Sequence, residues 1–278
     1  MPRHLSRGLP ARWPGPIPVA LAWSGGKDSS LTLAALRADP TVEVVALLTT
    51  VTGDYDRISM HGVRRTILEA QVSALRLPLV EALISAAASN AVYEEAFSAA
   101  LAELRQQHPD LRHLAFGDLF LTDVRAYRER LLAPLGWTPV FPLWGRDTAE
   151  LARHFVDAGY RAILTCVDTT QLSADFAGRE FDASLLNELP VTVDPCGENG
   201  EFHTCVYAGP IFRTPLSLQR GERGAPGRPV RVLRPGAARQ PVATVRLGVS
   251  WVGYVRGDVP VAERPRRSSR MPRFPALH

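Results

Sequence analysis

Residues 17–38 read IPVALAWSGGKDSSLTLAALRA, and this stretch decides the fold. An apolar run typical of a buried strand, residues 17–23, leads into two glycines, Gly25 and Gly26. Residues 28–38 then carry apolar side chains at helical spacing. A strand that delivers glycines to the start of a helix points backbone N–H groups and the positive end of the helix dipole at one spot. The sequence therefore predicts an anion-binding loop whose natural ligand is phosphate.

The rest of the first half repeats this alternation of strands and helices. Further strands are predicted at residues 42–51, 79–84 and 113–116, and helices after His61, at 90–107 and at 123–132. The strands are continuous apolar runs, which is typical of parallel strands that are covered on both faces. We therefore predict an α/β fold with a Rossmann-like, doubly wound parallel sheet and right-handed crossovers.

The composition divides the chain into four segments. They are a disordered lead-in at 1–16, a nucleotide-binding domain at 17–133, a smaller C-terminal α/β substrate domain at 134–212 and an arginine- and proline-rich tail at 213–278. The tail is interpreted as disordered or as outside the native reading frame, with a basic nucleic-acid-binding arm as a less favoured alternative. Only residues 242–254 of the tail resemble a strand.

The charge is distributed unevenly between these segments. The whole chain has a formal charge of +4, but the tail holds 14 basic and three acidic residues, a surplus of eleven positive charges. Residues 1–212 therefore carry a net charge of −7, which argues against a nucleic-acid partner for the folded part.

The composition also indicates a general class of protein. With 278 residues, 46% of them hydrophobic, the chain can bury one substantial core or two modest ones, and we expect a globular enzyme. No window reaches the roughly 18 apolar residues of a membrane span, and the N-terminus lacks the apolar region of a secretory signal, so a cytoplasmic location is expected. Three cysteines, Cys166, Cys196 and Cys205, form no CxxC pair, which favours reduced thiols over a zinc site or a disulfide framework.

The glycine loop combines hydroxyls, one amine and one carboxylate. Lys27 is the only lysine among 32 basic residues, which indicates that a compact ammonium is required at this position. Asp28 would repel phosphates unless it holds Mg²⁺, and we expect it to do so. The predicted phosphate-binding residues are Ser24, Gly25, Gly26, Lys27, Asp28, Ser29 and Ser30.

The loop lacks the Walker A pattern GxxxxGK[ST]. Instead, its SGGKDS string resembles the pyrophosphate-binding loop of the N-type ATP pyrophosphatases, which belong to the adenine nucleotide alpha hydrolase-like superfamily. That resemblance implies cleavage of ATP to AMP and pyrophosphate, with adenylation of a substrate oxygen.

A second polar motif, DPCGENGEFHT, occupies residues 194–204 between apolar segments at 189–193 and 206–212. It is predicted to be an irregular loop between strands, where chemistry often concentrates. Glu198 and Glu201 are candidates for bases or for groups that orient an amine, and His203 for proton transfer or contact with an adenylate phosphate. The alternative is a glycine-shaped turn whose acids and histidine cap neighbouring backbone. The chemistry of the residues leaves both interpretations open.

Further motifs narrow the resemblance. SGGKDSSL at 24–31, SMH at 59–61, GD at 117–118, FPLW at 141–144, DPCGENGEFHT at 194–204 and GPIF at 209–212 are similar to segments of the diphthine–ammonia ligase (diphthamide synthetase) family. The resemblance covers about residues 20–212, and the lysine-poor, arginine-rich composition suggests a bacterial member. It implies a HUP-type ATP domain, a smaller domain, and a substrate in the cleft between them.

The same resemblance implies that free ammonia attacks an acyl-adenylate to form an amide. Residues 123–130, DVRAYRER, depart from the Tyr-Gln-Arg run of the diphthamide-making members. The acyl substrate is therefore left open between diphthine, a corrinoid precursor and another small-molecule or protein-bound carboxylate.

The predicted site places ATP and Mg²⁺ across the carboxyl ends of the strands. Its phosphates lie on residues 24–29 beside Gly117, and the adenosine lies near Thr49, Thr50 and His61. The predicted catalytic residues are Lys27, Glu198, Glu201 and His203. Lys27 would stabilise charge on the departing pyrophosphate, and the other three would bind the substrate or ammonia.

Two other functions fit the sequence less well. One is a tRNA sulfur transferase of the same superfamily with Cys166 or Cys196 as nucleophile, and the other is an adenine-nucleotide sensor without turnover. The acidic folded part and the unpaired cysteines disfavour the first, and the acids of the second motif disfavour the second. The sequence is compatible with a homo-oligomer.

Overall fold

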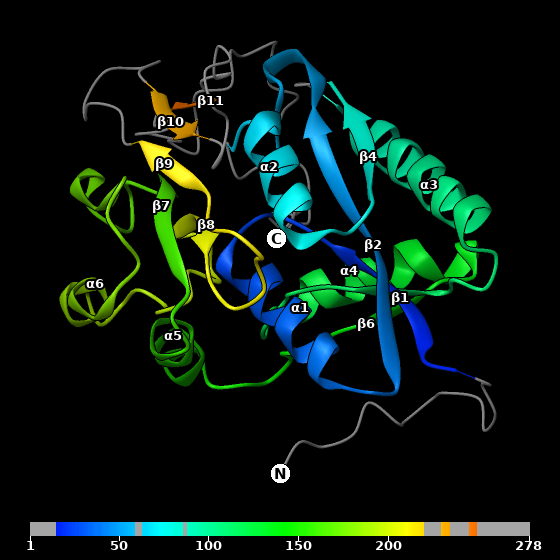
Figure 1. Ribbon diagram of the computed structural model, residues 1–278, viewed down its shortest axis with the longest axis horizontal. Helices are drawn as coiled ribbons and strands as arrows, with labels where there is room; N and C mark the ends of the chain where they lie inside the picture. Colours follow the sequence, from blue (N-terminus) through cyan, green and yellow to red (C-terminus); the bar gives the residue numbers. More distant parts are fainter. Residues whose placement is uncertain (1–14, 59–62, 86–87, 220–228, 234–244, 249–278) are drawn as a thin grey trace, which may run out of the picture.

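The computed structural model describes residues 15–58, 63–85, 88–219, 229–233 and 245–248. The first part of the chain alternates strands with helices, as predicted (Figure 1). Its elements are β1 (Ile17–Ala22), α1 (Lys27–Ala38), β2 (Val42–Thr52), the 3₁₀ turn η1 (Gly53–Tyr55), β3 (Arg57–Ile58), α2 (Arg65–Leu75), β4 (Leu79–Ile84), α3 (Asn90–Gln107), β5 (His113–Ala115), α4 (Thr122–Leu132), η2 (Ala133–Leu135) and β6 (Thr138–Val140).

Five strands form a parallel sheet in the order β4-β2-β1-β5-β6. β4 pairs with residues 47–52 of β2, and the two-residue strand β3 pairs antiparallel with Val51 and Thr52. The chain winds outward from β1 to β4 and then returns to β5 on the other side of β1. The strand order therefore reverses between β1 and β5, which is where open α/β sheets bind ligands.

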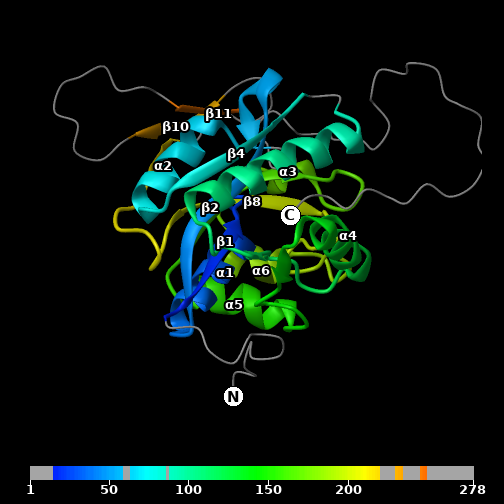
Figure 2. The ribbon, with the colours of Figure 1, turned by 90° about the vertical axis from the view of Figure 1, so that its right-hand side faces the viewer.

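Alternate residues of β1 feed two separate cores, one on each face of the sheet. Val19 and Leu21 pack with α1 and α2, whereas Ala20 belongs to the cluster formed with α3 and α4. Figures 1 and 2 show the two pairs of helices on opposite sides of the sheet. The doubly wound, Rossmann-like prediction is confirmed.

A smaller lobe lies beside α1 (Figure 1). It contains α5 (Thr148–Asp157), β7 (Arg161–Val167), η3 (Ala174–Phe176), α6 (Ala183–Glu188) and β8 (Phe202–Ala208). β7 and β8 form an antiparallel pair, and their buried side chains join the same hydrophobic cluster as α1 and α2. Because one cluster spans both lobes, the smaller lobe is fixed against the phosphate loop.

Both ends of α5 are set by residues close to them in the sequence. The Asp147 carboxylate accepts a hydrogen bond from the Glu150 N–H at 2.8 Å, which is the expected N-terminal cap. Gly159 has a φ of 79°, the left-handed conformation expected after the helix.

Three details differ from the sequence predictions. β6 pairs with β5, so the first sheet extends past the predicted boundary at 133/134. Residues 202–204 of the predicted loop belong to β8, because antiparallel pairing with β7 overrides the polar character of His203 and Thr204. The apolar segment 189–193 forms no strand; it follows the short helix α6 as irregular chain.

The described part of the predicted tail contains three short strands. β9 (Ser217–Gln219), β10 (Pro229–Leu233) and β11 (Val245–Gly248) form an antiparallel sheet, and β11 falls within the strand-like segment 242–254. No helix among the described residues has the length and hydropathy to cross a membrane.

Candidate active site

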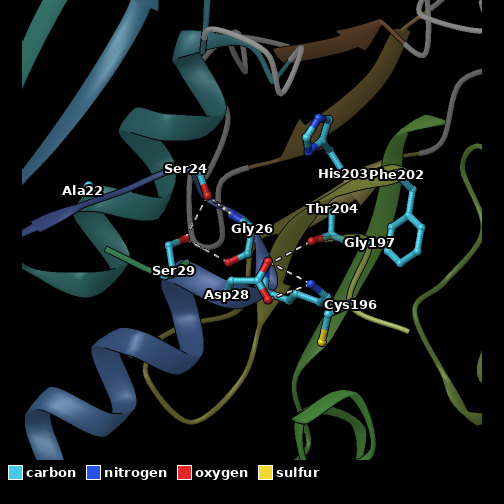
Figure 3. Close-up of a pocket in the computed structure, with 12 residues that line it drawn as sticks. Ala22, Ser24, Gly26, Asp28, Ser29, Cys196, Gly197, Phe202, His203 and Thr204 are labelled. Carbon is cyan, nitrogen blue, oxygen red and sulfur yellow. Dashed lines mark hydrogen bonds and ion pairs between the residues drawn. The ribbon is translucent and has the colours of Figure 1, made fainter. Parts of the chain in front are cut away.

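A pocket lies where the phosphate loop, the end of β5 and the second motif meet (Figure 3). Its lining residues are Ala22, Ser24, Gly26, Lys27, Asp28, Ser29, Gly117, Cys196, Gly197, Phe202, His203 and Thr204. The two motifs that are 170 residues apart in sequence therefore share one cavity, at the point where the strand order reverses.

Glycine is required in the loop for conformation and for space. Gly25 has a φ of 76°, and a Cβ at this position would lie 2.5 Å from the Oε1 atom of Gln71. A Cβ on Gly26 would lie 3.1 Å from the Thr204 carbonyl oxygen. Similarly, a Cβ on Gly117 would lie 3.0 Å from the backbone carbon of Asp28. These glycines let three segments approach one another at the pocket.

The three predicted loop serines have different surroundings. Ser24 and Ser29 line the pocket, and their hydroxyl oxygens are 3.2 Å apart. The Ser30 hydroxyl is buried and donates to the Gly26 carbonyl at 2.9 Å. Ser24 and Ser29 are thus placed to meet a ligand, while Ser30 stabilises the first turn of α1.

Lys27 and Asp28 form an ion pair at the floor of the pocket. The Lys27 Nζ atom lies 2.7 and 2.8 Å from the two Asp28 oxygens, and only 1% of Lys27 is exposed. Burial alone would lower the pKa of the Lys27 ammonium, but the Asp28 carboxylate raises it above its ordinary value. Lys27 therefore stays charged, with the Asp28 carboxylate as its partner.

Asp28 also fits the predicted role of a Mg²⁺ ligand. Its carboxylate lines the pocket and is 22% exposed. No group of three or more metal-binding side chains occurs in the described part of the chain. Mg²⁺ that bridges nucleotide phosphates commonly takes one or two protein carboxylates, so a single Asp is sufficient.

Strand β8 is bonded directly to the phosphate loop. The Thr204 hydroxyl accepts a hydrogen bond from the Lys27 N–H at 3.0 Å, and the Val206 N–H donates to the Gly25 carbonyl at 2.9 Å. Figure 3 shows Thr204 directed toward the loop, while the ring of its neighbour His203 points elsewhere. Thr204 belongs to the second motif, but the sequence pattern did not indicate its role, because its partner Lys27 is 177 residues away.

Glu198 connects the second motif to the end of β5. Its Oε1 atom accepts a hydrogen bond from the Leu119 N–H at 2.7 Å, and 2% of the residue is exposed. Burial, followed by the nearby Asp28 carboxylate, raises the pKa of Glu198 to about 8, although the Leu119 bond opposes the shift. At neutral pH this carboxyl is therefore largely protonated.

The other two predicted residues of the motif differ in position. Glu201 is buried, and its Oε1 atom accepts from the Asp194 N–H at 2.9 Å and from the Asn199 side chain at 3.1 Å. These bonds shape the loop itself, as the turn-capping alternative expects. His203, in contrast, is half-buried and lines the pocket.

The predicted adenosine contacts are only partly described. Thr49 lies near the carboxyl end of β2, where its hydroxyl donates to the Trp23 carbonyl at 2.7 Å, and it does not line the pocket. His61 lies outside the described residues. Adenosine binding by these residues stays a prediction.

Gln71 on α2 is a site residue that the sequence analysis missed. It is fully buried, and its Nε2 atom donates to the Gly25 carbonyl at 3.0 Å and the Val206 carbonyl at 2.7 Å. Its Oε1 atom accepts from the Trp23 indole at 3.1 Å. The available signal was a polar side chain on the apolar face of α2, one turn after Ile67.

The cysteines are held as thiols. Burial raises the pKa of Cys196 to about 12 and that of Cys166 to about 11. The Cys196 sulfur also donates to the Thr148 carbonyl at 3.3 Å. Because the thiolate is the reactive form, neither residue is prepared to act as a nucleophile.

Fold and site together define a Rossmann-like α/β protein whose glycine loop, at the strand-order reversal, shares a pocket with a motif from the smaller lobe. Family models agree: the diphthamide synthase N-terminal domain matches residues 17–138 and the diphthamide synthase C-terminal domain matches residues 147–225. The chain belongs to the diphthamide synthase family, which is a family of enzymes.

Two curated relatives carry the same name, diphthine–ammonia ligase. The protein from Schizosaccharomyces pombe is 26% identical over an alignment 212 residues long that covers 70% of this chain and 35% of that protein. The mouse protein is 24% identical over an alignment 251 residues long that covers 82% of this chain and 90% of that protein. The chain thus spans about a third of the length of the first relative and most of the second.

Proposed function

We propose that this protein is an ATP-dependent ligase that adenylates a substrate carboxylate, releases pyrophosphate and transfers ammonia to form an amide. The main support is the single pocket in which the phosphate loop meets the second motif. The names of the two relatives support a ligase that uses ammonia.

In the proposed mechanism, the N-terminus of α1, Ser24 and Ser29 bind the ATP phosphates. Lys27 releases Asp28 and stabilises the charge that develops on the departing pyrophosphate. Asp28 would then hold Mg²⁺, which neutralises phosphate charge when it is bound. The initial ion pair keeps both charged side chains satisfied before the nucleotide binds.

The second motif would supply the substrate side of the pocket. We assign contact with the acyl substrate or ammonia to His203, which is among the pocket-lining residues. Because its ring is directed away from Thr204 and the phosphate loop (Figure 3), this contact would be with a part of the substrate that lies away from the nucleotide phosphates. Glu198 would act by fixing the end of β5 against the second domain, and Glu201 by shaping the loop. This narrows the roles that the sequence left open for the two glutamates.

For the acyl substrate, we propose a chemical class, the carboxylates, and no single compound. Diphthine is the substrate named for both relatives. The sulfur-transferase alternative receives no support, since the thiols of Cys166 and Cys196 have raised pKa values.

The test is product analysis with ATP, Mg²⁺ and ammonium over a panel of acids that includes a diphthine-bearing protein and corrinoid precursors. We expect AMP and pyrophosphate that depend on one acid. Lys27→Ala should abolish their formation, and Lys27→Arg should not restore it, because a planar guanidinium cannot replace the buried ammonium. ADP and phosphate as products would refute the mechanism. Tight ATP binding without turnover would favour the sensor.

A further inference from the structure

Arg125, in the first turns of α4, contacts two neighbouring aromatic rings, those of Phe141 and Trp144. Its guanidinium carbon lies 5.0 Å from the Phe141 ring centroid and 4.9 Å from that of Trp144. The two rings are arranged edge to face, with centroids 5.8 Å apart. The Arg125 Nε atom donates to the Glu129 carboxylate at 2.9 Å. Three neighbours therefore fix the orientation of one guanidinium.

The outer edge of this guanidinium is free to bind a ligand. Within the described part of the chain, the terminal nitrogens of Arg125 make no hydrogen bond, and 39% of the side chain is exposed. A guanidinium carries five N–H donors, so four remain after the bond to Glu129. This edge matches the two oxygens of a carboxylate.

The Arg125 group lies on the same edge of the parallel sheet as the candidate active site. α4 follows β5 and the two aromatic residues follow β6, so both begin at the carboxyl edge of the parallel sheet, where the phosphate loop also lies. The Phe141 ring stacks on Phe116, with centroids 5.8 Å apart, and the next residue, Gly117, lines the pocket. A substrate that extends from the pocket along this edge would reach Arg125.

We propose that Arg125, oriented by Phe141 and Trp144, binds a second carboxylate of the acyl substrate, one that is not adenylated. The inference rests on the proposed ligase function and deepens it, because it narrows the candidate acids to those with a second carboxylate and so disfavours diphthine, whose one carboxylate would itself be adenylated. The proposed function assigns the nucleotide phosphates to the phosphate loop, so the Arg125 guanidinium is available to bind the acyl substrate. Because the rings hold the guanidinium in place, little side-chain freedom is lost on binding.

The test compares two acids of equal length, glutarate and pentanoate, titrated into the full-length protein in the millimolar range and followed by ligand-observed NMR. Arg125→Ala and Arg125→Lys are the test variants. Arg130→Ala is the matched control, because Arg130 is exposed on the same helix. ATP affinity is measured for each variant in parallel.

We expect glutarate to bind the unmodified protein and the control alike, and to bind both Arg125 variants at least about tenfold more weakly. Pentanoate should bind all four proteins equally weakly, and ATP affinity should not change. The proposal is overturned if glutarate binds no better than pentanoate, if Arg125→Ala retains glutarate binding, or if it weakens ATP binding instead. None of these measurements requires turnover, so a failure to form AMP would refute the ligase function separately.

Discussion

Replacing Gln71 with leucine should destabilise the protein and loosen the phosphate loop. Leucine has a similar volume, so the change removes hydrogen bonds with little change in packing. The Gly25 carbonyl would keep its bond from the Val206 N–H, but the Trp23 indole N–H and the Val206 carbonyl would each lose the Gln71 partner. A buried polar group without a partner costs about 1–3 kcal/mol, so the two together predict a loss of about 2–6 kcal/mol.

Urea unfolding followed by circular dichroism measures this loss in the free energy of unfolding. In a separate thermal unfolding experiment, the melting temperature should fall by at least about 4 °C, since each kcal/mol corresponds to about 2–4 °C in a protein of this size class. Gln107→Leu is the matched control, because Gln107 is exposed and bonds only to Glu103 in the described structure. We expect its stability to change by less than about 0.5 kcal/mol.

The same variant should bind ATP more weakly, because Gly25 would no longer be fixed by the Gln71 amide. A loss in Gln71→Leu below about 1 kcal/mol, or one equal to that of Gln107→Leu, would refute the reasoning. It would mean that the Trp23 and Val206 groups find other partners.

Three further predictions concern other contacts around the pocket. Glu198→Gln should stabilise the protein increasingly as pH rises from about 4.5 to 8, because folded Glu198 holds its proton up to a pKa of about 8, whereas the unfolded chain loses it near the ordinary 4.5. Urea unfolding across this range should show a gain in the free energy of unfolding of up to roughly 5 kcal/mol. Gly117→Ala should cost about 1–3 kcal/mol on thermal unfolding and reduce AMP formation, since its Cβ would press on the Asp28 backbone. Arg128→Met should cost about 3–5 kcal/mol in urea at neutral pH, because it leaves the Asp118 carboxylate, now 3.1 Å from Arg128, buried without its cation.

Each of these variants has a control elsewhere in the chain. Glu95→Gln on the exposed face of α3 should show no comparable pH trend, and a flat difference for Glu198→Gln would show that its carboxyl titrates normally. Gly53→Ala has open space around it, with the nearest atom 3.8 Å away, so equal costs at Gly53 and Gly117 would contradict the steric argument. Arg130→Met should be nearly neutral, and an equally neutral Arg128→Met would show that Asp118 is compensated by other groups.

Local sequence patterns predicted most of the first domain because its elements are specified by nearby residues. The apolar run of β1, the glycines after it and the helical spacing of α1 lie within 22 residues. The N-terminal cap of α5, in the smaller lobe, depends likewise on Asp147 and Glu150, which are three residues apart. Both kinds of signal can be read without knowing the rest of the fold.

The candidate site was less predictable because its contacts join distant segments. Glu198 bonds to a backbone N–H 79 residues away, and Gln71 to a carbonyl 135 residues away. Glu201 was predicted from its residue type, and its Oε1 atom bonds within its own loop, so a catalytic role for it stays a prediction. The polar residues His203 and Thr204 concealed the start of β8, because the strand is specified by its pairing with β7.

The attachment of β8 to the phosphate loop has a consequence during synthesis of the protein. The hydrogen bond from the Lys27 N–H to Thr204 joins residues 177 positions apart. At about 5–20 residues per second, a ribosome needs roughly 10–35 s to reach Thr204 after it has made Lys27. Throughout that interval the nascent chain carries an exposed glycine loop without the strand that completes it. A chaperone or nucleotide that contacts the nascent chain would therefore meet the glycine loop without its hydrogen bonds to β8, which the finished protein has.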